Sequence, residues 1–356
     1  MTAALAEKRF ADHPDGDPLS MTARLARRAL LQDPTAVKAV STLGLQAQMR
    51  GDARQARQFF DYAQRLSRRH LPTQLWAIED AVARGDVAQA LNHYDIALRT
   101  SNRAPDVLFP VLGSAISQAD VRRDLIALLR QRPLWAGEFV GFVAAGGLDP
   151  KAAALVLQGV QNSGVPITAE AVAFLINRLL DAGATDAAWD FYASARGVKD
   201  RRTSRDPHFV ANLSAPSVFD WTPINDAGIV TSMQRGPAGG LFDFATSSGA
   251  GGTILQQFEL LPPGTYRLEG RSAGIEQPTS SLPYWMMSCQ DGRETGRVAI
   301  PNSTHAGGRF VGYFIVPQAC PRQILALVVR SSANTVGVTG QIETASLRPT
   351  NESQGH

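Results

Sequence analysis

A spacing of 34 residues recurs through the first half of this sequence and constrains its fold more than any other feature. The clearest markers are Ala29, Ala63 and Ala97, which are each 34 residues apart. A fuller pattern of Gly-Asp, Ala, aromatic residue and Ala ends on the last two of these alanines: Gly51-Asp52, Ala56, Phe60, Ala63, and Gly85-Asp86, Ala90, Tyr94, Ala97. A fixed period of this length is typical of a solenoid, in which each copy stacks on its neighbours.

Each copy has the residues that a pair of antiparallel helices requires. Small residues allow two helices to cross closely, and an aromatic side chain fills the gap to the next pair. The glycine of each Gly-Asp pair permits a left-handed backbone where the first helix ends, and the aspartate can cap the second helix. We therefore predict two helices per copy, with turns at Gly51-Asp52 and Gly85-Asp86.

This pattern resembles the tetratricopeptide repeat. Residues 43–66, LGLQAQMRGDARQARQFFDYAQRL, match the Leu-Gly, Gly, Ala, aromatic and Ala positions of that family. Asp33-Pro34 fits the closing proline of the family, although no proline follows Ala63 at the corresponding place. The resemblance implies an α-solenoid of about five helix pairs with a right-handed twist.

A later copy of the motif is recognisable at residues 174–197, FLINRLLDAGATDAAWDFYASARG. Between the copies, residues 105–170 keep helical periodicity and lose the signature, so we expect degenerate helix pairs there. Four breaks are expected in this stretch, at Pro133, Gly146-Gly147, Pro150 and Pro166.

Members of this repeat family commonly bind a peptide or a protein on the concave face of the solenoid, so the resemblance implies a protein partner. Four basic residues are candidates for such a groove: Arg50, Arg54, Arg57 and Arg84. Charged residues in these positions equally suit an ordinary solvated face. A second interpretation is that the helices only present and orient the other half of the chain.

Composition changes sharply near residue 200. Seventeen of the 31 glycines lie between 217 and 350, in a stretch rich in Thr, Val, Ile, Phe and Ser, whereas Ala, Leu, Arg and Gln dominate before it. We predict a helical domain at 1–197, a linker at 198–217, a β domain at 218–350 and a tail at 351–356.

The sequence pI of about 9.0 comes from the first half and from a short basic run at the linker: Arg196, Lys199, Arg201, Arg202 and Arg205. A nucleic-acid-binding surface would gather Lys and Arg on one face and interleave aromatic residues, which this run does not do. We interpret the run as a solvated linker and expect no nucleic-acid partner. The charges favour a mobile linker, while apolar residues nearby could equally fix it in place: Pro207, Phe209, Val210 and Phe219.

From Val218 onward, short runs that alternate with period two are separated by Gly, Pro and Ser clusters. Eight strands are expected, at 228–233, 241–246, 253–260, 265–273, 284–289, 309–316, 323–331 and 340–347. The Pro-Pro-Gly turn before Tyr266 is typical of a hairpin that leads into a sandwich strand. This number of short strands predicts an antiparallel β-sandwich or jelly roll.

This half resembles the galactose-binding-like, carbohydrate-binding-module type of jelly roll. Together with the repeats, the triplet Phe219-Asp220-Trp221, the PPGTYRL segment at 262–268 and the two cysteines also resemble bacterial envelope proteins of exopolysaccharide production. The resemblance implies contact with a polysaccharide.

Sugar binding would use aromatic faces that stack on pyranose rings, with polar side chains nearby. The candidates are Trp221, Tyr284, Trp285 and the loop residue His305. In an alternating strand, however, one of Tyr284 and Trp285 must face the core. Trp221 equally suits a role in pinning the linker to the sandwich, and a polar loop residue such as His305 needs no ligand.

Both cysteines, Cys289 and Cys320, lie in the β half, each near the end of an expected strand. A disulfide between them would suit an oxidising compartment such as a bacterial periplasm. The alternative is two buried thiols, which would favour a cytoplasmic protein. The first thirty residues hold four acidic residues and no uninterrupted apolar core, so export would require a signal or anchor that this chain lacks. No apolar run is long enough to span a membrane.

The sequence has no recognisable catalytic or metal-binding constellation. The six histidines share no metal-ligand spacing, and GAGGT at 249–253 lacks the Lys-Thr of a phosphate loop, so we expect a turn there and no cofactor. Carboxylates of the β half are spread along strands and turns, and a glycosidase would need two of them to face each other across a cleft, which the sequence alone leaves open. We expect a non-enzymatic envelope protein whose solenoid docks a protein partner and whose sandwich contacts polysaccharide. The first alternative is a purely structural scaffold, and the second, less favoured by the sequence, is a polysaccharide-processing enzyme.

Overall fold

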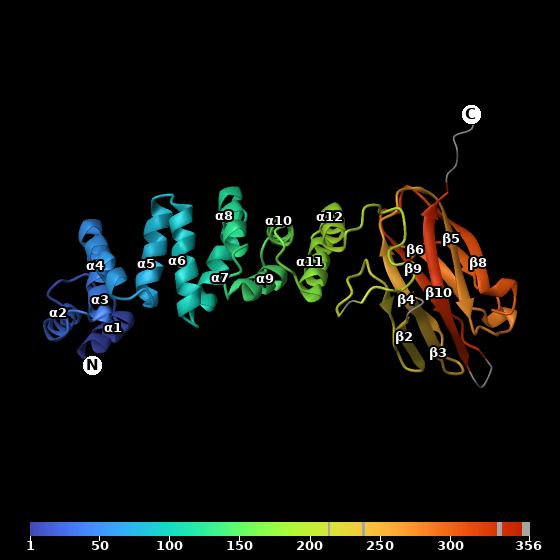
Figure 1. Ribbon diagram of the computed structural model, residues 1–356, viewed down its shortest axis with the longest axis horizontal. Helices are drawn as coiled ribbons and strands as arrows, with labels where there is room; N and C mark the ends of the chain where they lie inside the picture. Colours follow the sequence, from blue (N-terminus) through green and yellow to red (C-terminus); the bar gives the residue numbers. More distant parts are fainter. Residues whose placement is uncertain (213, 237–238, 333–336, 351–356) are drawn as a thin grey trace, which may run out of the picture. The chain divides into compact units, whose positions relative to one another are not determined.

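The computed structural model describes residues 1–212, 214–236, 239–332 and 337–350 (Figure 1). Contacts divide the chain into two compact units, Met1–Pro166 and Ile167–His356. The tail expected at 351–356 lies outside the described residues.

The first unit is helical, and its helices follow one another in chain order (Figure 1). Ten α-helices occur among its residues: α1 (Thr2–Asp12), α2 (Met21–Gln32), α3 (Val37–Met49), α4 (Ala53–Leu66), α5 (Leu71–Ala83), α6 (Val87–Thr100), α7 (Ala104–Ala115), α8 (Ala119–Leu129), α9 (Ala136–Ala145) and α10 (Pro150–Gln161). Within the described residues, no helix is both long and apolar enough to cross a membrane.

The turns expected at the Gly-Asp pairs are confirmed. Gly51 and Gly85 adopt φ angles of +78° and +71° after α3 and α5, a region that L side chains rarely enter. The carboxylate of Asp52 accepts a hydrogen bond from the Gln55 N–H at 3.0 Å, and that of Asp86 does the same for Gln89. Each Gly-Asp pair therefore ends one helix and caps the next.

The small and aromatic residues of the repeat pack as their spacing predicts. A Cβ placed on Gly44 of α3 would lie 2.8 Å from Cε2 of Phe60 in α4, so only glycine allows this close crossing. The Phe60 ring is fully buried and stacks on Trp76 of α5 at 4.2 Å between centroids. Since α5 belongs to the next copy, this aromatic contact joins consecutive helix pairs.

Helix ends elsewhere in this unit also follow the sequence. Pro133 lies between α8 and α9, Gly146 ends α9, and Pro150 is the first residue of α10, where its missing N–H costs nothing. The first 32 residues form two further helices, α1 and α2. The Ser20 hydroxyl caps α2 by accepting a hydrogen bond from the Ala23 N–H. This serine lies outside the 34-residue pattern of Gly-Asp, Ala and aromatic positions.

The second unit combines two helices with a β-sandwich. The helices are α11 (Ala169–Asp181) and α12 (Thr185–Arg196). The strands are β1 (Thr222–Pro223), β2 (Ile229–Gly236), β3 (Gly239–Thr246), β4 (Gly252–Glu259), β5 (Gly264–Ala273), β6 (Tyr284–Cys289), β7 (Glu294–Ala299), β8 (Arg309–Val316), β9 (Gln323–Val329) and β10 (Val338–Pro349). All eight expected strands are present, and GAGGT falls in the β3–β4 turn and the start of β4.

Two strands, β1 and β7, were not expected from sequence. β1 has only two residues. β7, with sequence ETGRVA, has one buried residue, Val298, and therefore no alternation of apolar residues to reveal it.

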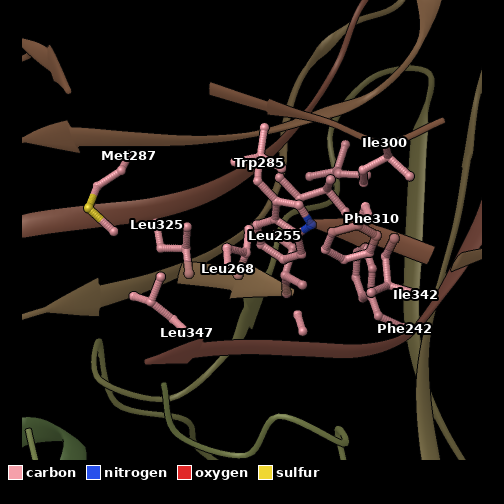
Figure 2. Packing of buried hydrophobic residues seen from close by; sticks show 14 of the residues in the cluster. Phe242, Leu255, Leu268, Trp285, Met287, Ile300, Phe310, Leu325, Ile342 and Leu347 are labelled. Carbon is pink, nitrogen blue, oxygen red and sulfur yellow. The ribbon is translucent and has the colours of Figure 1, made fainter. Parts of the chain in front are cut away.

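The ten strands form two antiparallel sheets of five. Sheet A has the order β1-β4-β9-β6-β7, and sheet B has the order β2-β3-β10-β5-β8. Their facing sides enclose one apolar core, and Figure 2 shows Trp285 at its centre beside Leu255 and Phe310. This is the α-then-β-sandwich architecture expected from sequence.

Residues 204–209 pair with sheet B. The Ser204 N–H donates to the Leu347 carbonyl at 3.0 Å, and the Ala345 N–H donates to the Pro207 carbonyl at 3.0 Å. The His208 carbonyl accepts from the Gly240 N–H at 3.1 Å. The segment therefore continues sheet B beside β10. Of the two alternatives that the sequence left open, a mobile linker and one that is fixed in place, this part of the chain follows the second.

Arg205 in this segment is also buried, which corrects its interpretation as a solvated charge. Its guanidinium is 3% exposed and forms an ion pair with Glu259, whose side chain is 0% exposed. It also donates to the main-chain carbonyls of Phe219 and Phe258. The rings of Trp189 and Phe219 lie 5.7 and 5.9 Å from the guanidinium carbon. One cation thus ties α12, the 204–209 segment and β4 together.

Candidate functional site

The three aromatic residues predicted to stack on sugar are buried. Trp285 is 0% exposed and Trp221 is 5% exposed, and their rings are in contact inside the sandwich core at 5.5 Å between centroids. The Trp221 indole N–H donates to the Asp206 carbonyl at 3.0 Å, which pins the 204–209 segment to the core. This is the structural alternative that the sequence left open for Trp221.

Tyr284 and His305 occupy different surroundings. Tyr284 alternates with Trp285 and so lies on the opposite face of sheet A, where its ring is 8% exposed and contacts the guanidinium groups of Arg297 and Arg330 at 4.8 and 4.9 Å. His305 is exposed in the turn before β8. None of the predicted aromatic rings presents an open face for a sugar.

The predicted disulfide is confirmed. Cys289, at the end of β6, is bonded to Cys320 before β9, with 5.4 Å between their Cα atoms. The bond closes a loop across 31 residues that contains β7 and β8.

The outer face of sheet B carries two hollows lined largely by polar side chains. Strands β8, β5 and β10 lie side by side, and the residues opposite one another form three rows: Arg309, Arg271 and Thr344; Val311, Glu269 and Ser346; Tyr313, Arg267 and Arg348. All of these side chains point away from the core because the alternate residues of each strand are buried.

Ion pairs connect part of this face, which we call the arginine face. Arg267 and Arg348 approach Glu269 at 2.9 and 3.9 Å. Arg271 pairs with Glu343 at 3.1 Å. All five side chains remain 37–64% exposed, so they are open to a ligand as well as to one another.

Two hollows lie on the arginine face. The larger, of about 670 Å³, extends from Arg309 and Arg271 to Arg348 and has Pro207 and His208 in its lining. The smaller, of about 490 Å³, has Tyr313 in its lining. Both include Arg267, Glu269 and Arg348, so the two hollows adjoin at these side chains, and we refer to them together as the groove of the arginine face.

Edge strand β8 adds apolar side chains to the rim of this groove. Val311, Tyr313 and Ile315 are 56%, 58% and 66% exposed. Sequence reasoning missed the face because RFVGYFIV is apolar in both of its alternating phases. The pattern indicated a strand without indicating which phase faces the core.

The basic residues predicted for the helical groove separate into two groups. Arg57 and Arg84 both pair with Asp80 of α5, at 2.9 and 3.0 Å. Arg50 instead donates to the Gly16 carbonyl and to Gln55, and Arg54 is exposed on α4.

A groove of about 540 Å³ lies between α4, α5 and α6. Arg57 and Arg84 are in its lining, together with Asp61, Gln64, Arg65, Arg68, Trp76, Gln89, Asn92 and His93. His93 contacts Gln74 at 2.9 Å, and burial together with the nearby cations Arg68 and Arg84 lowers its pKa. The groove thus presents amides, cations and a neutral imidazole above an apolar floor.

A further hollow of about 450 Å³ is lined by α12, the segment from 198 to 220 and nearby strands. Its main polar groups bond to one another: Asp220 accepts from Tyr192 at 2.9 Å and from Arg196 at 3.4 Å, while Gln257 bonds with the Arg205 main chain. We therefore assign this hollow to the scaffold. Among the described residues, no group of three or more His, Cys, Asp or Glu side chains is placed to hold a metal ion.

No protein-family model matches the chain, and no curated protein matches it. Among solved structures, the enzymatically active domain of tailspike protein 4 from bacteriophage CBA120 is similar over 38% of this chain and 20% of its own, at 11% identity and a TM-score of 0.27. The glycosylation-associated protein complex Gap123 from Streptococcus agalactiae is similar over 34% of this chain and 39% of its own, at 12% identity and a TM-score of 0.23. The chain spans less than half of either protein.

Proposed function

We propose that this protein is a non-catalytic binding scaffold of the bacterial envelope. Its tetratricopeptide-like helices dock a protein partner, and its carbohydrate-binding-module-like sandwich contacts polysaccharide during exopolysaccharide production or export. The observation that carries the proposal is the groove on the arginine face. The disulfide between Cys289 and Cys320 supports an oxidising compartment.

The chemistry of the arginine face supports sugar binding. Guanidinium groups donate and carboxylates accept several hydrogen bonds each in fixed planes, which suits ligands with many hydroxyls. Tyr313 adds an exposed ring whose face can cover the apolar side of a pyranose. The site proposed here replaces Trp221, Tyr284 and Trp285, whose buried rings serve the fold.

The groove between α4, α5 and α6 supports the docking role. It has Trp76 on its floor and amide and guanidinium groups on its sides, so it offers apolar contact with polar groups around it. Protein interfaces are built in the same way, with an apolar centre and a polar rim.

A glycan array probed with the full-length protein tests the polysaccharide role, with the Tyr313→Ala variant as comparison. We expect retention of at least one bacterial-type polysaccharide and a loss of signal in the variant, because the exposed ring is removed without disturbing the core. Val230→Ala is the matched control, since Val230 is 68% exposed on the opposite edge strand, β2. Absence of all binding, or equal signals from both variants, would contradict the proposal.

One observation favours a second function, a purely structural scaffold without sugar binding. The burial of Trp221, Tyr284 and Trp285 removes the aromatic platform expected of a lectin-like sandwich. A pull-down with the wild-type protein and an Arg57→Ala/Arg84→Ala double variant separates the two functions. A partner lost on the double substitution, together with an empty glycan array, would favour the scaffold.

A further inference from the structure

On the arginine face, two pairs of arginine side chains lie directly opposite one another on neighbouring strands. Arg309 of β8 pairs in register with Arg271 of β5, and Arg267 of β5 pairs with Arg348 of β10. Like charges at directly opposed positions destabilise a sheet. Two such pairs, in the first and third of the three rows, therefore indicate a surface arranged for something other than its own stability.

Acidic residues on this face offset only part of the charge. Glu269 serves both Arg267 and Arg348, and Glu343 serves Arg271. Four arginines and two glutamates leave two positive charges in excess. No carboxylate among the described residues pairs with Arg309, which is exposed at the end of the larger hollow.

From this arrangement we propose that the arginine face selects an acidic polysaccharide, one whose sugar rings carry carboxylate groups. This inference rests on the proposed polysaccharide binding and adds the charge class of the ligand. Arg309 and Arg271 receive one carboxylate between them, since two guanidinium groups on adjacent strands can each donate a planar pair of hydrogen bonds to it. Binding also relieves the repulsion between the two cations.

The other opposed pair, Arg267 and Arg348, suits the next sugars of the same polysaccharide chain. Arg267 and Arg348 share Glu269, so that carboxylate holds them in place and leaves their outer N–H groups for sugar hydroxyls or a second acid. Tyr313 stands opposite Arg267 in the same row and can cover a ring face. The arginine face thus offers an acid-binding pair, Arg309 and Arg271, in the first row and a ring-covering group, Tyr313, in the third.

A nucleic acid is also a polyanion, but the face favours a glycan. Among the Phe, Tyr and Trp side chains that line the two hollows, Tyr313 is the one open to solvent, whereas strand binders offer several such rings for successive bases. Glu269 and Glu343 can also accept hydrogen bonds from a ligand. A uronic acid polymer has hydroxyls on its sugars that can donate to these carboxylates, whereas a phosphodiester group has no donor.

The test compares three polymers on full-length protein by isothermal titration: polygalacturonate, the same polymer fully methyl-esterified, and neutral dextran. We expect polygalacturonate to bind at least about tenfold more tightly than its ester, because charge-assisted hydrogen bonds are lost in the ester. We expect this difference to shrink as ionic strength rises from about 0.01 to about 0.15 M. Equal affinity for acid and ester would overturn the inference and leave the proposed function standing, whereas failure of all three polymers would count against both.

Variants localise the effect. Arg309→Gln should weaken polygalacturonate binding roughly fivefold or more, because it removes the unpaired cation without breaking an ion pair. The matched control is Arg330→Gln, which makes the same change of charge at an exposed residue that directly follows β9 in sheet A. Equal losses in both variants would mean non-specific attraction, and tighter binding of dextran sulfate or of a DNA oligonucleotide than of polygalacturonate would also overturn the inference.

Discussion

Replacing Arg205 with methionine would remove the cation from the interior of the second unit while keeping much of its volume. Glu259 would then be buried without a counter-charge, and the carbonyls of Phe219 and Phe258 would lose their donor. Breaking a buried ion pair by removing one partner costs about 3–5 kcal/mol. We expect a loss of this size in the free energy of unfolding.

A paired substitution separates the ion pair from the packing. In Arg205→Met/Glu259→Leu no charge stays buried, so most of the loss should be recovered, and the coupling energy should reach about 2 kcal/mol. Urea unfolding followed by tryptophan fluorescence gives these energies, measured above the pKa of Glu259 of about 7, where its carboxyl is ionised and the ion pair is complete. Amide hydrogen exchange on β4 assigns them to the second unit, since Phe258 and Glu259 lie in that strand.

Two results would refute this reasoning. One is a loss below about 1 kcal/mol for Arg205→Met, which would mean that the ion pair and its hydrogen bonds are replaced by water. The other is a double variant as unstable as the sum of the two single variants. In that case the residues would act independently in spite of their contact.

Three further outcomes follow from the structure. Burial raises the pKa of Glu259 to about 7 from 4.5. Between these two pH values the folded state holds a proton that the unfolded state has lost, so the free energy of unfolding should fall as the pH rises from 4.5 to about 7. In urea titrations at a series of pH values, Glu259→Gln should remove this dependence. Replacing Cys289 and Cys320 with serine opens a loop of 31 residues and should cost roughly 3–4 kcal/mol, measured by thermal unfolding against the oxidised protein. Gly44→Ala forces a Cβ against Phe60 and should cost about 1–3 kcal/mol by the same measurement.

Two of these outcomes, those for Glu259 and Gly44, have a matched control in the chain. Glu294→Gln changes an exposed carboxylate and should leave the pH slope of unfolding unchanged, in contrast to Glu259→Gln. Gly137 in α9 has nothing within 4 Å of a new Cβ, so Gly137→Ala should be neutral or stabilising. A destabilised Gly137→Ala variant would show that the predicted cost at Gly44 does not come from the clash with Phe60.

Local signals in the sequence predicted the elements well. The Gly-Asp pairs determine a backbone conformation and a cap that depend only on neighbouring residues, which is why the turns at Gly51 and Gly85 could be located. The eight expected strands were found because alternation and turn residues are also local. β7 was missed because Val298 is its one buried residue, and a strand that buries a single side chain leaves no periodic signal.

The candidate site could not be predicted because it depends on contacts between distant residues. Arg271 and Arg309 are 38 positions apart and become neighbours only through the β5–β8 register. The aromatic residues of 284–285 drew attention by their chemistry, yet strand alternation places Trp285 in the core. Likewise, Arg205 lies in a run of charged residues that is typical of a solvent-exposed segment. Its partner, Glu259, is 54 positions away in β4 and comes close only in the folded chain.

The pairing of residues 204–209 with sheet B has a mechanical consequence. The chain leaves α12, joins the sheet beside β10, and reaches β1 only afterwards. A pull applied through α12 would therefore load the hydrogen bonds at Ser204, Pro207 and His208 before it reached the first strand of the core. Because several such bonds lie side by side and Arg205 anchors the same segment, these bonds would have to break before the force reached the strands that enclose the core.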